Sequence, residues 1–229
     1  MPAHHTNALL SSFRHASRKG SGKGLRKGLA RNTSRRPALG AGILAALTIA
    51  GCVTSARGFS ATADEVRAAV TSHLSESGHA LLLEFRDLLS LPNVSTNIDD
   101  MRRNADWIES YLEPRGFESR TVYAGRAPYV LAEKRYPGAT KTVLVYAHYD
   151  GQPVAPWNWA TPPFEPTLKN NGQILSWDDI DADALNDDWR IYARSAGDDK
   201  APLIALIHAL DALEEAGITP SVNIKLFLD

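Results

Sequence analysis

The stretch "TVLVYAHYDGQPVAP", residues 142–156, joins an apolar run directly to a histidine and a carboxylate. Its apolar residues at 143–145 predict a buried β-strand, because branched apolar side chains favour strands. His148 and Asp150 follow at the end of that strand, where burial costs free energy unless a hydrogen bond or a metal ion compensates. The stretch therefore predicts an α/β core with a polar site at the end of one strand.

His148 and Asp150 lie two residues apart on an extended segment, so their side chains point to the same side. A metal-binding imidazole needs a fixed tautomer, and a carboxylate that accepts its other N–H supplies one. A core histidine bonded to a backbone carbonyl explains the same pair equally well. The first motif alone leaves both interpretations open.

A second polar cluster lies in "ARSAGDDKAP", residues 193–202, between a glycine-containing loop and the start of a helix. Asp199 is expected to cap that helix, which leaves Asp198 without a structural role. Consecutive carboxylates repel each other unless a cation or a helix dipole balances them. Asp198 is therefore a candidate cation ligand.

Helical and strand patterns alternate along the rest of the chain. Helices are predicted over 63–92 (as one or two), 98–117 and 202–217, and strands over 119–125, 128–136 and 221–229, with a long loop over 151–188. This order predicts an α/β fold with a mixed, largely parallel sheet that helices cover on both faces. We expect residues 221–229 to form an edge of the sheet, His73 and His79 to lie on the surface, and His208 to lie in the core.

Charge is unevenly distributed. Ten of the 25 basic residues precede Asp64, the first acid, which leaves 15 basic residues against 26 acids in the body of the protein. A body this acidic disfavours nucleic acid as a partner. The basic start ends at Arg36, and 20 residues without a charge follow at 37–56. This order of basic, apolar and small residues is typical of a secretory signal.

The segment "LTIAGC", residues 47–52, resembles a bacterial lipobox. Residues 1–51 are then a signal peptide of lipoprotein type, Cys52 is the lipid attachment site, and 52–62 form a tether. Cys52 is the single cysteine, so no disulfide within the chain explains it. An ordinary signal peptide and an uncleaved membrane anchor are the alternatives. The lipoprotein interpretation implies the bacterial cell envelope, with a lipid anchor in the membrane and the protein facing the periplasm or the outside.

The motifs together resemble a known family. Their order is "AHYDGQPV", a Trp/Pro-rich loop with "PPFEP", "YARSAGDDKAP", an apolar helix and a strand. This resembles the cocatalytic zinc metallopeptidases, which include carnosine dipeptidases, glutamate carboxypeptidases, aminoacylases and succinyl-diaminopimelate desuccinylase. The resemblance covers residues 75–229. It implies that residues 63–229 are the N-terminal part of the catalytic domain.

The resemblance also implies roles for particular residues. His148 binds one zinc ion, Asp150 is the catalytic residue that orients this histidine, and Asp198 bridges two zinc ions in the complete protein. A cis peptide is implied between Asp198 and Asp199. Glycines of the family pattern are replaced around the second motif by Ala193, Ser195 and Ala201. These replacements affect the geometry of the loop and leave the ligands in place.

In the family, the strand that corresponds to 222–229 runs into a glutamate-rich turn. That turn supplies the general base and another zinc ligand, and an aspartate and a histidine further on complete the site. The sequence ends at Asp229, so we expect a fragment or a truncated gene product that is inactive alone.

The resemblance implies a zinc-dependent exopeptidase of dipeptidase or carboxypeptidase type that hydrolyses short peptides. It also implies that the complete protein can form a homodimer. An N-acyl amino acid amidohydrolase is one alternative, because deacylases share these motifs. A non-catalytic, truncated envelope lipoprotein is another.

Overall fold

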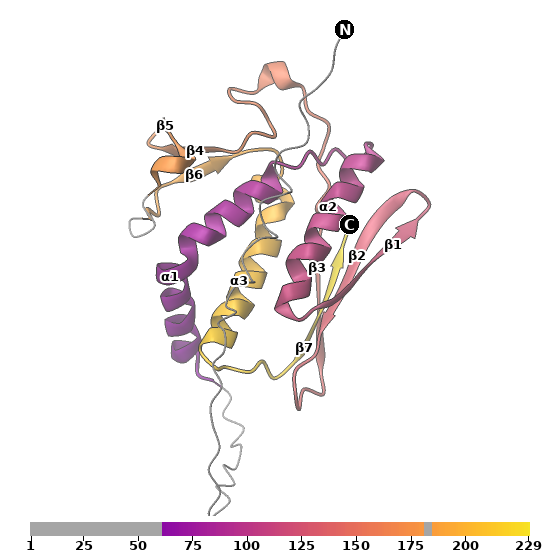
Figure 1. Cartoon of the computed structure of the whole chain (residues 1–229), viewed down its shortest axis with the longest axis vertical. Helices are drawn as coiled ribbons and strands as arrows, with labels where there is room; N and C mark the ends of the chain where they lie inside the picture. Colours follow the sequence, from indigo (N-terminus) through magenta and orange to yellow (C-terminus); the bar gives the residue numbers. More distant parts are fainter. Residues whose placement is uncertain (1–60, 181–184) are drawn as a thin grey trace, which may run out of the picture. The chain divides into compact units, whose positions relative to one another are not determined.

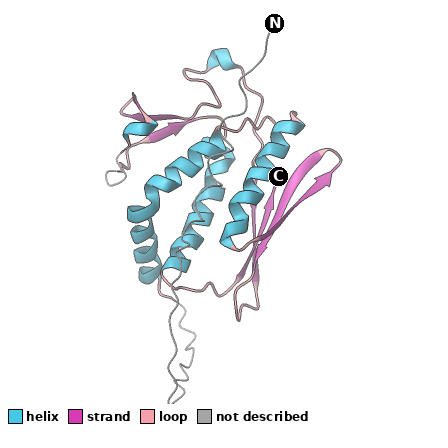
Figure 2. Cartoon of the chain, viewed as in Figure 1, coloured by secondary structure: helices cyan, strands magenta, loops and turns pink. Residues whose placement is uncertain are grey.

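Three long helices and a four-stranded sheet carry both motifs (Figure 1). A computed structural model describes residues 61–180 and 185–229, all of which belong to one compact unit. Figure 2 shows how the helices and strands are distributed. The helices are α1 (Ala63–Leu89), α2 (Ile98–Leu112) and α3 (Ala201–Glu215). The predicted helices are therefore confirmed, and the first forms as a single helix.

The ends of the helices follow from local chemistry. At the start of α1, the side chain of Thr62 accepts from the backbone N–H of Glu65, whose carboxylate accepts from Thr62 in return. Such a capping box satisfies backbone donors that a helix start leaves unpaired. A short turn, η1 (Glu113–Arg115), follows α2. Pro202 lies in the first turn of α3, and Gly217 follows its end with φ of 69°.

The main sheet has the order β1-β2-β7-β3. Its strands are β1 (Glu118–Ala124), β2 (Ala127–Lys134), β3 (Thr142–Ala147) and β7 (Asn223–Leu228). The prediction of an α/β fold with a mixed sheet flanked by helices is confirmed. Parallel pairing in this sheet is limited to β3 with β7, while β1 with β2 and β2 with β7 are antiparallel. β1 and β2 are joined by a tight turn, which makes antiparallel neighbours, and the chain passes from β3 to β7 through α3, a helical crossover of the kind that makes parallel ones.

Strand order corrects two expectations. β7 was expected at an edge, but it lies between β2 and β3, so the edges are β1 and β3. β3 was expected to be buried, but Val143 is 45% exposed and Leu144 is 64% exposed. Leu144 pairs with Lys225 on the face away from the helices and meets solvent there. Val143 pairs with the core residue Ile224, but it lies on an edge strand, which has a neighbour on one side only.

The core fills the space between the helices and one face of the main sheet. Its fully buried members include Leu88, Ile108, Leu112, Val130, Ile207, Leu226 and Leu228. His73, expected on the surface, is buried on α1 and is hydrogen-bonded to His208 of α3. The helical partner supplies the burial, which the pattern of α1 alone did not indicate.

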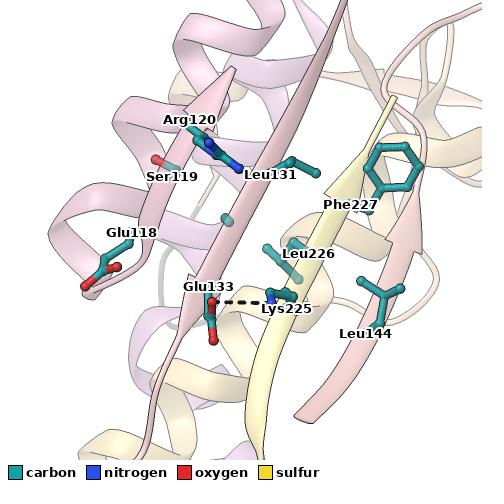
Figure 3. Close-up of a pocket in the computed structure, with 10 residues that line it drawn as sticks. Glu118, Ser119, Arg120, Leu131, Glu133, Leu144, Lys225, Leu226 and Phe227 are labelled. Atoms are coloured by element: carbon teal, nitrogen blue, oxygen red, sulfur yellow. Dashed lines mark ion pairs between the residues drawn. The ribbon is translucent and has the colours of Figure 1, made fainter. Parts of the chain in front are cut away.

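The opposite face of the main sheet is open over the described residues, where Leu144 and Tyr146 are exposed. The expectation that helices cover both faces is therefore wrong for this part of the chain. A hollow of about 370 Å³ lies on it, with Leu131, Leu144 and Phe227 among the side chains that line it (Figure 3). Lys225 and Glu133 form an ion pair across it at 3.5 Å. His148, Asp150 and Asp198 do not line this hollow. The candidate site therefore lies elsewhere.

The predicted long loop contains a second sheet, of order β5-β4-β6. Its strands are β4 (Thr167–Asn170), β5 (Gln173–Leu175) and β6 (Arg190–Tyr192), and two short turns, η2 (Pro156–Asn158) and η3 (Trp177–Asp179), accompany them. The β4–β5 hairpin turns at Asn171 and Gly172, with φ of 48° and 81°. Asn-Gly suits such a turn because both positions need positive φ.

The predictions for the N-terminal region lie outside the described residues. These are the signal peptide over residues 1–51, the acylated Cys52, and the tether as far as residue 60. Among the described helices, none combines the length and the apolar character that crossing a membrane requires.

Candidate metal centre

His148 and Asp150 project from the segment that follows β3. His148 donates from Nδ1 to Oδ1 of Asp150 over 2.9 Å. Tyr149 lies between them, is 1% exposed, and donates from its hydroxyl to the carbonyl oxygen of Pro128 at 2.6 Å. Side chains alternate along an extended segment, so the buried tyrosine holds the histidine and the aspartate on the other side.

The second motif brings Asp198 to the free side of the imidazole. Nε2 of His148 lies 3.0 Å from Oδ1 of Asp198. Asp198 belongs to the turn η4 (Ala196–Lys200), and the Asp198–Asp199 peptide bond is cis, as the family resemblance implies. The side chain of Asp198 is 89% exposed. One imidazole therefore lies between two carboxylates, and one of the two is open to solvent.

Asp199 does not have the role expected of it. α3 begins after Lys200 with no side-chain cap. Instead, Oδ2 of Asp199 accepts from the backbone N–H of His148 at 3.4 Å. Both consecutive aspartates thus face the first motif, because the backbone at Asp198 and Asp199 is not helical.

Electrostatics at the site favour a positive charge. Burial lowers the pKa of His148, but its hydrogen bond to Asp150 and the charge of that carboxylate outweigh burial and raise the pKa overall. Three carboxylates near one imidazole form an environment that a proton or a metal cation can neutralise.

Lys200 fixes the turn that carries Asp198. Its side chain is 1% exposed, and Nζ donates to the carbonyl oxygens of Leu88 at 2.8 Å and Leu91 at 3.0 Å. These carbonyls lie at the end of α1, where cations are favourable. Burial lowers the pKa of Lys200 to about 7. The turn is therefore tied to the connector between α1 and α2.

Sequence reasoning missed that connector. Residues 93–97, interpreted as a polar turn, include Asn93, which is fully buried and contacts both motifs. No local pattern marks this asparagine, because its partners lie 56 and 102 residues away along the chain.

The donor atoms suit a zinc ion. Two ligands bonded at about 2.0–2.2 Å to tetrahedral zinc lie about 3.3 Å apart, close to the 3.0 Å between His148 Nε2 and Asp198 Oδ1. Within residues 61–180 and 185–229, no group of three or more His, Cys, Asp or Glu side chains could hold a metal ion. The described part of the chain thus contributes a pair of donors.

A small space lies beside Asp150. A hollow of about 100 Å³ is lined by Asp150 and Asp229, together with Ser95 and Tyr129 among others. Asp229 follows β7, and its Oδ1 accepts from the hydroxyl of Tyr146 at 3.0 Å. The ends of parallel β3 and β7 therefore meet beside the candidate site.

Known proteins share these features. Residues 144–228 match peptidase family M20/M25/M40, and this range contains both motifs. The chain is 37% identical over 100 residues to Cys-Gly metallodipeptidase dug1 of Schizosaccharomyces pombe, which covers 43% of this chain and 17% of that protein. It is 29% identical over 147 residues to succinyl-diaminopimelate desuccinylase of Delftia acidovorans, which covers 62% of this chain and 33% of that one.

A solved structure agrees. The dipeptidase Dug1p from Saccharomyces cerevisiae superposes with a TM-score of 0.56 at 21% identity, over 72% of this chain and 34% of that one. This likeness shows the fold. The chain spans a third or less of the length of the two curated relatives above. Over residues 144–228, the range that contains both polar motifs, this chain is similar to the M20/M25/M40 family of peptidases.

Proposed function

We propose that the natural polypeptide containing this sequence is a zinc-dependent exopeptidase that hydrolyses short peptides. The observation that carries the proposal is the line of contacts from Asp150 through His148 to Asp198, at 2.9 Å and 3.0 Å. His148 and Asp198 are the proposed metal ligands, and Asp150 is the residue that orients the imidazole.

Each of these residues has a distinct task. Asp150 accepts the proton of Nδ1 of His148, which leaves Nε2, 3.0 Å from Asp198, as the nitrogen that would bind a metal ion. The second carboxylate oxygen of Asp198 lies on an exposed side chain, which supports the proposal that this aspartate bridges two zinc ions. Bound zinc would supply Lewis acidity, which polarises a substrate carbonyl and lowers the pKa of water.

The substrate class follows from the relatives. A metallodipeptidase supports dipeptides as substrates. The desuccinylase, which matches a longer stretch, supports a second candidate, an amidohydrolase of N-acyl amino acids. Both are hydrolases, and the geometry of the site favours either over a non-catalytic lipoprotein. The homodimer of the complete protein stays a prediction of the family resemblance.

The test is hydrolysis by the natural polypeptide of two panels, one of dipeptides and one of N-acyl amino acids. We expect turnover that a chelator abolishes, that added zinc restores, and that His148→Ala removes. His79→Ala, a histidine change on α1 away from the site, is the matched control and keeps turnover. Chelator-resistant turnover, or full activity in His148→Ala, would contradict the proposed site.

We further propose that Cys52 is acylated and anchors the protein in the bacterial envelope. The lipobox-like "LTIAGC" and the single cysteine support this. Cells fed labelled palmitate should label the wild-type protein and leave Cys52→Ala unlabelled. Equal labelling of the two proteins would rule the anchor out.

A further inference from the structure

We propose that Asn93 is a positioning residue that sets the spacing between His148 and Asp198. This inference rests on the proposed function, because it concerns the same pair of donors. Asn93 lies in the connector between α1 and α2, outside both motifs, and is fully buried.

One amide group of Asn93 contacts both motifs. Its Nδ2 donates to the backbone carbonyl of Tyr149 at 2.7 Å and to Oγ of Ser195 at 2.9 Å. Tyr149 lies between His148 and Asp150, and Ser195 precedes η4, which carries Asp198. An amide nitrogen has two hydrogens, so each motif receives one. A rigid planar group thus fixes one loop against the other.

The backbone of Asn93 adds to this link. Its carbonyl oxygen accepts from the N–H of Gly151 at 2.7 Å, and the N–H of Ser95 donates to the carbonyl of Gly151 at 3.0 Å. A Cβ at Gly151 would lie 2.8 Å from Oγ of Ser195 and 3.0 Å from Oδ1 of Asn93. The first motif, the second motif and the connector therefore meet at Gly151, where any larger residue would collide with Ser195 and Asn93.

The remaining atom of the amide, Oδ1 of Asn93, is buried and has no hydrogen-bond donor among the described residues. The positioning role therefore rests on the two hydrogen bonds that Nδ2 donates. Lys200 ties the second motif to the same connector but does not contact the first. Of Asn93 and Lys200, only the side chain of Asn93 forms hydrogen bonds with both motifs.

The chain offers a matched control. Asn104 on α2 is also fully buried, and its Nδ2 also donates two hydrogen bonds, in this case both to backbone carbonyls, those of Pro92 and Asp100. Its Oδ1 likewise lacks a donor among the described residues. Asn104→Ala therefore removes the same chemistry as Asn93→Ala, without removing a bond to either motif.

The primary experiment uses the metal-free, full 229-residue chain. Nuclear magnetic resonance would measure the through-space cross-peak between the ring of His148 and the side chain of Asp198. We expect this cross-peak in the wild type and in Asn104→Ala, and its loss in Asn93→Ala. Ser195→Ala, which removes one acceptor and no backbone bond, should weaken it. Wild-type intensity in Asn93→Ala would overturn the proposal. If Asn93→Ala does not fold, wild-type intensity of the cross-peak in Ser195→Ala would overturn the proposal. Absence of the cross-peak from the wild-type protein would overturn it as well.

A second measurement separates this inference from the proposed function. Cobalt(II), a spectroscopic stand-in for zinc, would be titrated into each folded variant. Partners that support ligands typically change metal affinity by about 10- to 100-fold, so we expect the cobalt dissociation constant to rise about 10-fold in Asn93→Ala and to hold in Asn104→Ala. If the wild type has the cross-peak but binds no cobalt, the metal site fails while the positioning role of Asn93 stands. If the wild type binds cobalt and Asn93→Ala binds it equally well, the positioning role fails.

Discussion

The part of the chain that the structure describes contains two clusters in which histidine meets carboxylate, and the two clusters differ in access to solvent. The open cluster consists of His148, Asp150 and Asp198. The closed cluster consists of His73, His208, Glu84 and Glu215, between α1 and α3. In the closed cluster His73 bonds to Glu215 at 2.7 Å and to His208 at 2.9 Å, and His208 bonds to Glu84 at 3.0 Å.

Exposure separates the two clusters. The ring side chains of His73 and His208 are 4% and 6% exposed, and all four of their ring nitrogens have partners within the cluster. In the open cluster, Asp198 is 89% exposed. A ligand can reach the open cluster without breaking the fold, whereas the closed cluster has no free donor atom on its rings. The same residue types therefore build a candidate site in one place and a helix contact in the other.

The sharpest way to break this comparison is to remove His148. His148→Ala deletes one of the two proposed ligands of the open cluster. We expect zinc affinity, measured by titration calorimetry, to fall by at least about 100-fold, beyond the usual effect of losing a supporting residue. The unfolding free energy should change little. Unchanged zinc affinity would remove the functional difference between the clusters.

Removal of His208 should have the opposite pattern. His208→Ala leaves Nε2 of buried His73 without its partner and removes one of the hydrogen bonds to Glu84. We therefore expect the unfolding free energy in urea to fall by about 2–3 kcal/mol. Zinc affinity of the folded variant should stay within about twofold of wild type. A control, His79→Ala, should cost about 0.5 kcal/mol or less. A His208→Ala protein of wild-type stability would show that the closed cluster contributes nothing.

Asp150→Asn sharpens the comparison within the open cluster. The amide keeps the shape of the carboxylate and can still accept from Nδ1 of His148, but it loses the charge. Zinc affinity should fall about 10-fold, with stability unchanged because Asp150 is partly exposed. Asp187→Asn, on an exposed loop, is the control. An equal loss in both variants would point to a general electrostatic effect.

The smallest expected effect concerns pH. Burial raises the pKa of Glu84, but hydrogen bonds from His208 and Tyr111 and the charge of Arg115 outweigh it and lower the pKa to about 2. A lowered carboxylate pKa stabilises the fold above its ordinary value of 4.5, and the contribution is lost as pH falls toward 2. Because Glu84 is partly exposed, we expect about 1 kcal/mol. The difference in unfolding free energy between wild type and Glu84→Gln should shrink over this window, and Glu76→Gln should show no such change.

Much of the open cluster is visible in the sequence. The period of an extended segment placed His148 and Asp150 on one side, and the family resemblance implied that Asp198 would join them. Asn93 could not be found in this way, since a buried turn asparagine resembles an exposed one until its distant partners are known. The burial of His73 has the same origin, because it depends on the packing of α3.

The misses in the sheets have different causes. An apolar run such as 143–145 predicts a strand, but burial depends on strand order, which no local pattern contains. The small sheet was missed because its strands are short, although Asn171-Gly172 is a strong hairpin signal. In that loop the Asn-Gly turn predicts the hairpin even though the strands on either side of it are short.

The position of β7 has a consequence for synthesis on the ribosome. β7 is the last strand in the described sequence, yet β2 and β3 both pair with it. At about 5–20 residues per second, β3 leaves the ribosome several seconds before its partner exists. The β1–β2 hairpin can form early, but the apolar faces of α1 and α2 stay without a completed sheet during that interval. We therefore expect these apolar faces to be accessible to chaperones until residues 223–228 emerge and pair with both β2 and β3.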